Sequence, residues 1–184
     1  MNAAIAITIV VVLSLVAVGA IVFGVVLLIR SLKASGTRRT VVTFIGRKEA
    51  ILASYKALWN VVQRLAQASD EELSRFNEDP ADEERRTFEE VASRMRIVED
   101  ELKSTEVPPG LETAAMTMED AARLIFEAAG SVDGAGESDA LTAAGEIDFQ
   151  VIADAVARME TELHDTAARY HVDESSLYGG GLYI

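Results

Sequence analysis

Hydrophobic side chains recur at steps of three and four along most of the chain from about residue 40 onward. This spacing is the period of an α-helix with one buried face, and no stretch alternates apolar and polar residues as a half-buried strand does. Four helices are predicted in this way, at 40–68, from Pro80 to beyond Leu102, at 112–130, and from 139 or 146 to 171. Their apolar faces comprise Ile51, Tyr55, Leu58, Val62 and Leu65, with Leu52, Trp59 and Ala66 alongside; Phe88, Val91, Met95, Val98 and Leu102; Ala115, Met118, Ala122, Ile125 and Ala129; and Phe149, Ile152, Val156, Met159, Leu163, Ala167 and Tyr170.

Turn and capping signals separate these stretches. The capping-box pattern at 69–72 predicts a short helix that ends near Phe76. Asp79 is expected to cap the next helix, with Pro80 at its first position. The turn at 107–110, with two prolines and a glycine, ends that helix, and a loop rich in glycine follows at 130–138. Gly145 marks a break near the start of the last helix.

Four amphipathic helices of similar length with short connections predict an antiparallel bundle. The expected fold is therefore all-α: one N-terminal transmembrane helix, a domain like a four-helix bundle, and a C-terminal tail. Its divisions are an anchor at 1–30, a basic hinge at 31–48, the bundle at 40–172 and the tail at 173–184.

The anchor is predicted from the run between Ala3 and Ile29, which carries no charge and is dominated by Val, Ile, Leu and Ala. About 20 such residues cross the hydrocarbon core as a helix, so this run is long enough to span it. A cleaved signal peptide is the alternative, but it requires a basic start, a shorter apolar run and a cleavage site of small residues. The small residues Ala20 and Gly24 lie four apart, a spacing that lets two membrane helices approach closely.

A basic cluster follows the apolar run directly. Between Arg30 and Lys48 the chain has six basic residues and no acidic one; Arg30, Lys33, Arg38 and Arg39 stand nearest the span. Because cytoplasmic flanks of membrane helices are enriched in Lys and Arg, we expect the N-terminus outside and the C-terminal domain in the cytoplasm, at the inner (plasma) membrane. The same side chains can bind anionic lipid headgroups. The apolar stretch at 41–45 is expected to rest in the membrane interface, and 35–37 to act as a hinge.

From Glu49 onward the composition is strongly acidic. The other 11 basic residues face all 30 acidic ones there, a formal charge of −19. Such a domain repels phosphate backbones, so we expect no nucleic-acid partner. The chain has no cysteine, which excludes disulfides, thiolate metal sites and a cysteine nucleophile.

The sequence offers little that resembles catalytic chemistry. It has no phosphate-binding glycine loop, no dinucleotide fingerprint and no nucleophile elbow. Glu160, His164 and His171 share one side of the last helix and could form a weak metal site, but the two histidines lie at the edge of the apolar face and are expected at the surface. The aromatic set Tyr55, Trp59 and Phe88, and the methionines 95, 116, 118 and 159, are expected in the core rather than in a binding groove. We therefore expect no enzyme activity, cofactor, metal or small-molecule substrate.

The last ten residues differ from the rest of the chain. Three glycines separate two Leu-Tyr pairs, and large apolar side chains are concentrated there: Leu177, Tyr178, Leu182, Tyr183 and Ile184. The bundle pattern is complete by Tyr170, so the tail is not needed to finish the core. It is expected to dock on a partner, although folding back onto its own bundle and acting as a degradation signal remain alternatives.

Two functions fit these features. The first is a non-catalytic accessory or scaffold subunit of a bacterial inner-membrane complex, attached to other membrane subunits through its span and tail. The second is a membrane-tethered adaptor or regulator whose acidic bundle binds a soluble partner. The plan of one N-terminal span before a small acidic helical bundle resembles small accessory subunits of bacterial membrane complexes, such as those of actinobacterial respiratory supercomplexes (cytochrome bcc with an aa3-type oxidase). The turn at 107–111 also resembles helical domains of actinobacterial envelope proteins, which usually lie outside the membrane. The first resemblance implies an accessory subunit of a respiratory complex that binds no haem or copper itself.

Overall fold

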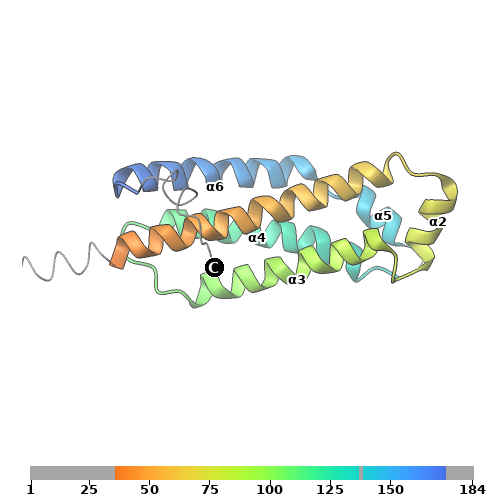
Figure 1. The fold of residues 1–184 in the computed structure, drawn as a ribbon, viewed down its shortest axis with the longest axis horizontal. Coiled ribbons are helices and arrows are strands. Elements are labelled where there is room, and N and C mark those ends of the chain that lie inside the picture. The colour runs from red at the N-terminus through yellow and green to blue at the C-terminus, as the bar shows by residue number, and fades with distance from the viewer. Residues whose placement is uncertain (1–35, 137–138, 173–184) are drawn as a thin grey trace, which may run out of the picture. The chain divides into compact units, whose positions relative to one another are not determined.

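The computed structural model describes residues 36–136 and 139–172, and within these ranges the chain is helical and has no strand. The prediction of an all-helical bundle is thereby confirmed. A helix occupies 36–65 and is followed by five shorter helices (Figure 1). These are α2 (Asp70–Glu78), α3 (Glu83–Ser104), α4 (Glu112–Asp133), α5 (Ala140–Gly145) and α6 (Phe149–Arg169).

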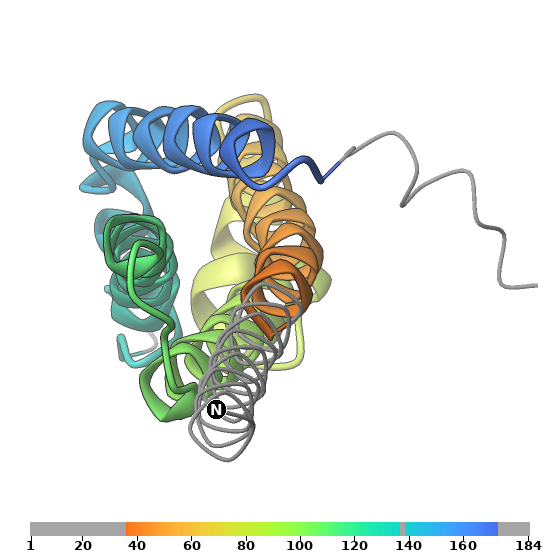
Figure 2. The same ribbon diagram turned by 90° about the vertical axis from the view of Figure 1, so that its left-hand side faces the viewer.

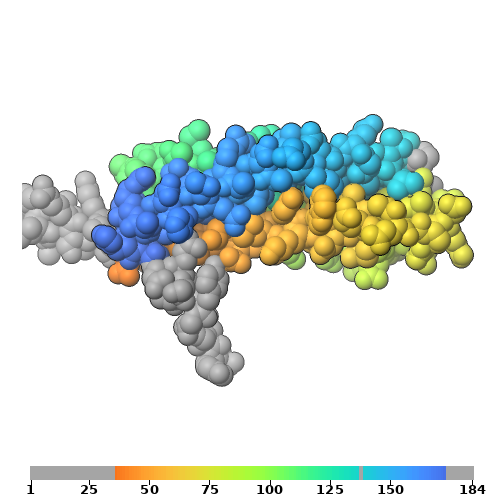
Figure 3. Space-filling model, turned by 90° about the horizontal axis from the view of Figure 1, so that it is seen from above, coloured from red at the N-terminus to blue at the C-terminus, as the bar shows by residue number. Residues whose placement is uncertain are grey.

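The four long helices form an antiparallel bundle. In the end-on view of Figure 2, the 36–65 helix, α3, α4 and α6 follow one another around a square, and in Figure 1 each runs opposite to its neighbours. Figure 3 shows the face on which α6 lies beside the 36–65 helix, where Trp59 and Phe149 meet edge to face with ring centroids 4.9 Å apart. The connections between successive long helices are short, so each helix packs antiparallel to the one before it. In this arrangement all four helices bury their apolar faces in one core.

The short helices α2 and α5 close one end of the bundle. Phe76 of α2 is buried and lies 6.0 Å from the ring of Phe88 in α3. The backbone N–H of Leu141 in α5 donates to Asn77 Oδ1 at 3.1 Å. Arg85, itself mostly buried, donates from Nη2 to the carbonyl of Ala135 at 3.2 Å. Together these contacts join α2 to α3 and to α5, and they join the start of α3 to the loop between α4 and α5.

Helix ends follow the predicted capping chemistry at one site and depart from it at another. Ser69 and Glu72 form the predicted capping box at the start of α2. The predicted N-cap at Asp79 is wrong: its N–H donates to Arg75 and ends α2, and its Oδ1 accepts from the N–H of Ala81 at 2.8 Å. Asp82 caps α3 instead, accepting from Glu84 N–H at 3.0 Å. Both aspartates can bind free N–H groups, and the one followed directly by helix-forming residues becomes the cap.

The capping box predicts a measurable titration shift. Hydrogen bonds from the Ser69 backbone N–H and hydroxyl lower the pKa of Glu72 from its ordinary value. We expect Ser69→Ala to raise the pKa of Glu72, as measured by NMR titration of its side-chain carboxyl. A depressed folded pKa adds stability above the unfolded pKa, and this stability is lost as pH falls through the folded pKa, so the variant should also lose less stability on acidification. Ser74→Ala, on the same helix, should leave the pKa of Glu72 unchanged; an equal shift in both variants would contradict this account.

Several predicted core positions are shifted by one or two residues. Val61 is buried where Val62 was expected, and Trp59 keeps 42% of its surface exposed although it was expected in the core. Met116 was also expected in the core and is 68% exposed. Stretch 41–45 was expected in the membrane interface, but Val41, Phe44 and Ile45 are buried in the bundle core. The buried apolar side chains that the sequence placed correctly include Ile51, Leu58, Leu65, Phe88, Val91, Met95, Val98, Leu102, Met118, Ala122, Ile125, Ala129, Ile152, Val156, Met159, Leu163 and Ala167.

One polar side chain lies in the core without a partner. Ser54, on the 36–65 helix, is fully buried, and its Oγ makes no hydrogen bond to any described residue. A buried hydroxyl without a partner loses its hydration at a cost of about 1–3 kcal/mol. We expect Ser54→Ala to raise the free energy of unfolding by about 1 kcal/mol or more, measured by chemical denaturation of the purified chain.

Alanine also forms helices better than serine, so the Ser54→Ala prediction needs a matched control. Ser93→Ala changes an exposed serine within α3 and should gain only the difference in helix propensity, about 0.5 kcal/mol. If the two variants gain equally, the Ser54 hydroxyl is not the source of the effect.

The predicted anchor and the whole of the predicted tail lie outside the described residues. The same holds for Ala20, Gly24, Arg30 and Lys33. No helix among residues 36–136 and 139–172 is both long and apolar enough to cross a membrane. Residues 36–48, the described part of the predicted hinge, are helical and continue into the bundle without a break.

The C-terminal end of α6 has a defined turn. Tyr170 caps the helix, and His171 follows with a positive φ of 53°. The N–H of His171 donates to Ala168 at 3.2 Å and that of Val172 to Ala167 at 2.9 Å. This pattern is a Schellman motif, in which the chain folds back over the last helical turn, and Val172 is accordingly buried.

Candidate functional site

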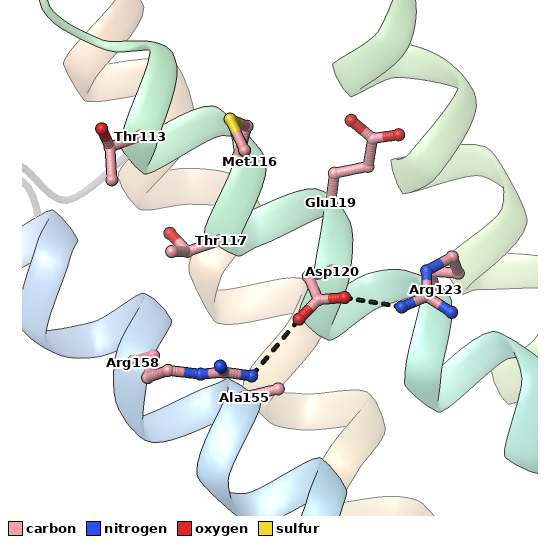
Figure 4. Close-up of a pocket in the computed structure, with 8 residues that line it drawn as sticks. All are labelled: Thr113, Met116, Thr117, Glu119, Asp120, Arg123, Ala155 and Arg158. Carbon is pink, nitrogen blue, oxygen red and sulfur yellow. Dashed lines mark hydrogen bonds and ion pairs between the residues drawn. The ribbon is translucent and has the colours of Figure 1, made fainter.

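A surface groove of about 380 Å³ lies between the first half of α4 and the middle of α6. Figure 4 shows the residues that line it: Thr113, Met116, Thr117, Glu119, Asp120 and Arg123 from α4, with Ala155 and Arg158 from α6. Ala155 and the threonine methyl groups supply apolar surface, and the exposed thioether of Met116 stands at the groove. Thr113, Met116 and Thr117 thus lie toward one end of the groove, and Asp120, Arg123 and Arg158 form its charged part (Figure 4).

The charged end is organised around Asp120, whose two carboxylate oxygens accept from two different helices (Figure 4). Arg123 Nη2 donates to Oδ1 at 2.6 Å, one turn along α4. Arg158 Nη2 reaches Oδ2 from α6 at 3.3 Å. Arg123 also binds both oxygens of Glu127, at 2.9 and 3.1 Å. Asp120 thus joins α4 to α6 through a short network of surface ion pairs.

The two arginines differ in how fully they are engaged. Hydrogen bonds that Arg123 donates to Asp120, and in second place to Glu127, raise the pKa of Arg123 above its ordinary value, which keeps it charged at any physiological pH. Among the described residues Arg158 contacts Asp120 alone, at 3.3 Å, and its side chain is 65% exposed. A guanidinium has five N–H donors and a flat face that stacks on aromatic rings. Arg158 therefore retains unused binding capacity at the edge of the groove.

A second hollow of about 260 Å³ lies at the end of the bundle near α2. It is crossed by two ion pairs, Arg64 to Glu84 at 3.1 Å and Arg75 to Asp82 at 3.0 Å. The Asp82 side chain is almost fully buried because it also caps α3. These polar groups hold the helix ends together, as Asp120 joins α4 to α6 in the groove described above.

The described part of the basic cluster divides into two pairs. Arg38 and Arg39, both expected to contact headgroups, are exposed at the start of the first helix. Arg47 instead pairs with Glu101 of α3 at 2.6 Å, and Lys48 is mostly buried. Arg47 and Lys48 are therefore packed into the bundle, while the side chains of Arg38 and Arg39 are exposed.

The remaining predicted residues have clear placements or lie beyond the described chain. Glu160, His164 and His171 are all exposed, which agrees with surface histidines. Among residues 36–136 and 139–172, no three His, Asp or Glu side chains are grouped so that they could hold a metal ion. The tail residues Leu177, Tyr178, Leu182, Tyr183 and Ile184 fall outside these ranges.

The sequence did not reveal the groove, because its two walls come from segments 38 residues apart. The available signal was Met116, an apolar residue two positions from the buried Met118 and therefore on the opposite side of α4.

Comparison of this chain with protein-family models, with curated proteins and with solved structures finds no match.

Proposed function

We propose that this chain is a non-catalytic accessory or scaffold subunit of a bacterial inner-membrane protein complex, such as a respiratory supercomplex. In this proposal the uncharged run 3–29 crosses the membrane beside other subunits, and the bundle lies on the cytoplasmic side. Anionic headgroups bind the exposed arginines at the start of the bundle, and the tail contributes a second attachment to the complex.

The observation that carries the proposal is the continuity of the first helix. From the first described residue, 36, it runs through the later part of the basic cluster to residue 65 as one of the four bundle helices. Arg38 and Arg39 are exposed on its first turns, while Arg47 joins it to α3. The described part of the basic cluster therefore lies on one of the bundle helices, which supports attachment of this end of the bundle near anionic headgroups.

The acidic end of the bundle favours the alternative function, a tethered adaptor for a soluble partner. Asp70, Glu71 and Glu72 open α2, and Glu83 and Glu84 open α3 at the same end (Figure 1). A basic surface on a soluble protein would be attracted to this end, and the attraction would weaken with salt.

Purification of the tagged full-length chain in mild detergent, with mass spectrometry of what accompanies it, tests both functions. We expect a constant set of integral membrane proteins in amounts comparable to the chain. Deleting 177–184 should lower their recovery. The matched control removes three negative charges by Asp70→Asn, Glu71→Gln and Glu83→Gln. This charge-neutral variant changes only exposed side chains and should leave the recovery of membrane proteins unchanged.

Two results would contradict the accessory-subunit proposal. A monodisperse chain without partners would remove its basis. Recovery of a soluble protein that disappears with the charge-neutral variant would favour the adaptor instead. Fusions at the C-terminus test the orientation separately: we expect fluorescence from green fluorescent protein and no activity from alkaline phosphatase, because the bundle is placed in the cytoplasm.

A further inference from the structure

The outer side of α3 carries charged side chains that the bundle does not use. In Figure 2, α3 occupies one corner of the square, so one of its sides faces away from the other long helices. The exposed charged residues there are Arg86, Glu89, Glu90, Arg94, Arg96 and Asp100. None of these side chains makes a hydrogen bond or an ion pair with a residue in the ranges 36–136 and 139–172. Both signs of charge are therefore available on this side of α3 to a partner.

The order of these charges is antisymmetric about Ser93. Arg86 and Asp100 each lie seven residues from Ser93, about two helical turns, so the three share one line along α3. Acidic side chains occupy 89 and 90, before Ser93, and arginines occupy 94 and 96, after it. The sign of the charge thus runs positive, negative, positive, negative along the helix. Read from the other end, every sign is inverted, so the helix is complementary to a copy of itself that runs in the opposite direction.

An antiparallel pair of α3 helices that cross at Ser93 brings opposite charges together. Arg86 then lies opposite Asp100 of the second copy, and Glu89 lies on the same flank of the crossing as Arg96 of the second copy. A two-fold axis repeats each contact, as in any interface between two identical surfaces. In a parallel pair each residue would instead meet its own copy, so Arg86 would face another Arg86 and the like charges would repel.

The surface around the crossing point has the shape for such a contact. A shallow hollow of about 460 Å³ lies there, lined by Arg86, Glu89, Glu90, Ser93, Arg94 and Ile97. The small side chain of Ser93 lets two helices approach closely. Ile97 is 57% exposed, and packing against a second copy removes its apolar surface from water. The hollow therefore adds an apolar contact to the ion pairs, which contribute little by themselves when they are exposed.

We propose that the outer side of α3 is a homodimerisation surface, on which a second copy of the chain docks through its own α3 in the antiparallel direction. The dimer is weak and sensitive to salt, because it depends on exposed charges. The first helices of the two copies start at opposite ends of the pair, so two copies held at one membrane lie with their bundles along its surface. The inference concerns the bundle and does not depend on the assembly proposed above.

Disulfide trapping between copies tests the direction of pairing, because the chain has no cysteine of its own. Ser93→Cys places a thiol at the crossing, where the thiols of two copies meet. Ser104→Cys is the matched control, since Ser104 is an exposed serine eleven residues further along the same line of α3. In an antiparallel pair the two copies of position 104 are about 33 Å apart. We expect the full-length chain in mild detergent to form disulfide-linked dimers roughly tenfold faster with Ser93→Cys than with Ser104→Cys.

Exchange of charges tests whether the ion pairs are responsible. Arg86→Glu places a negative charge opposite Asp100 of the second copy and should slow trapping at Ser93→Cys by roughly fivefold. Adding Asp100→Arg to the same chain should restore the rate, because the pairs between copies again have opposite signs. Within one chain the two positions are about 21 Å apart, so they cannot restore the rate by pairing with each other. All these residues are exposed, so the bundle should stay folded, and circular dichroism can verify this.

Three results would overturn the proposal. Equal rates for Ser93→Cys and Ser104→Cys would show that the copies meet in parallel or at random. Absence of trapping in both variants would show that α3 does not bring two copies together. Failure of Asp100→Arg to restore the rate would show that Arg86→Glu acts without this ion pair. Loss of partner proteins in the purification above, with trapping at Ser93→Cys intact, would count against the accessory function alone.

Discussion

Met118→Ala is expected to lower the free energy of unfolding by about 2–5 kcal/mol, the largest loss among the substitutions considered for this chain. Met118 is fully buried on the face of α4 that also carries Ala114, Ala122 and Ile125. Truncation removes its contacts and leaves a cavity, since the small alanines around it cannot move in to fill the space. Denaturant unfolding followed by the fluorescence of Trp59, the only tryptophan of the chain, measures the change.

Met116→Ala is the matched control, with the same substitution two residues earlier in the same helix. Because Met116 is 68% exposed, its loss should change the free energy of unfolding by no more than about 0.5 kcal/mol. Similar losses in both variants would show that α4 does not present the face that the structure gives it. A loss confined to Met118→Ala would establish the orientation of α4 in solution.

The same two methionines show how well the buried face of α4 could be predicted from the sequence. Both were expected in the core, since apolar residues within a helical stretch usually face it. The buried face of α4 consists largely of alanine, and alanine also occupies exposed helix positions, so the contrast between faces is weak. In α3 the contrast is strong, because Phe88, Met95 and Leu102 oppose charged residues, and there the predicted face was correct. The side of a helix that faces the core can therefore be predicted from the sequence only where its two faces differ clearly in polarity.

Helix ends were predictable where one residue had the capping chemistry and ambiguous where two competed. Ser69 and Glu72 left no alternative for α2, whereas Asp79 and Asp82 stand three residues apart and both accept backbone N–H bonds. The groove between α4 and α6 could not be predicted at all. It depends on the register that brings Arg158 to Asp120, and this register is set by tertiary packing rather than by either segment alone.

The turn before α4 requires a positive φ at one position, and the sequence has glycine there. Leu111 N–H donates to the carbonyl of Pro108 at 3.1 Å, and Gly110 has φ of +92°. These values describe a type II turn, with Pro109 at its second position and glycine at its third, where a positive φ is required. A Cβ at Gly110 would also lie only 2.8 Å from Tyr170 Oη. The turn is therefore restricted by its own backbone and by the end of α6.

Gly110→Ala is accordingly expected to lower the free energy of unfolding by about 1–3 kcal/mol, the cost of holding a residue with a Cβ in a sparsely populated backbone region. Adding Tyr170→Phe removes the hydroxyl in the way and should recover part of the loss, while the backbone cost remains. The size of the recovery, compared with Tyr170→Phe alone, separates the steric contribution from the backbone contribution.

The same substitution at Gly130 should have the opposite sign. Gly130 lies inside α4 with helical geometry, and no atom stands within 4 Å of a Cβ built there. Gly130→Ala should therefore raise the free energy of unfolding by about 1 kcal/mol, because alanine forms helices better than glycine. Both variants can be measured by the same denaturant unfolding as Met118→Ala. If Gly110→Ala also stabilised the chain, the positive φ at this turn and the contact between the start of α4 and the end of α6 would both be wrong.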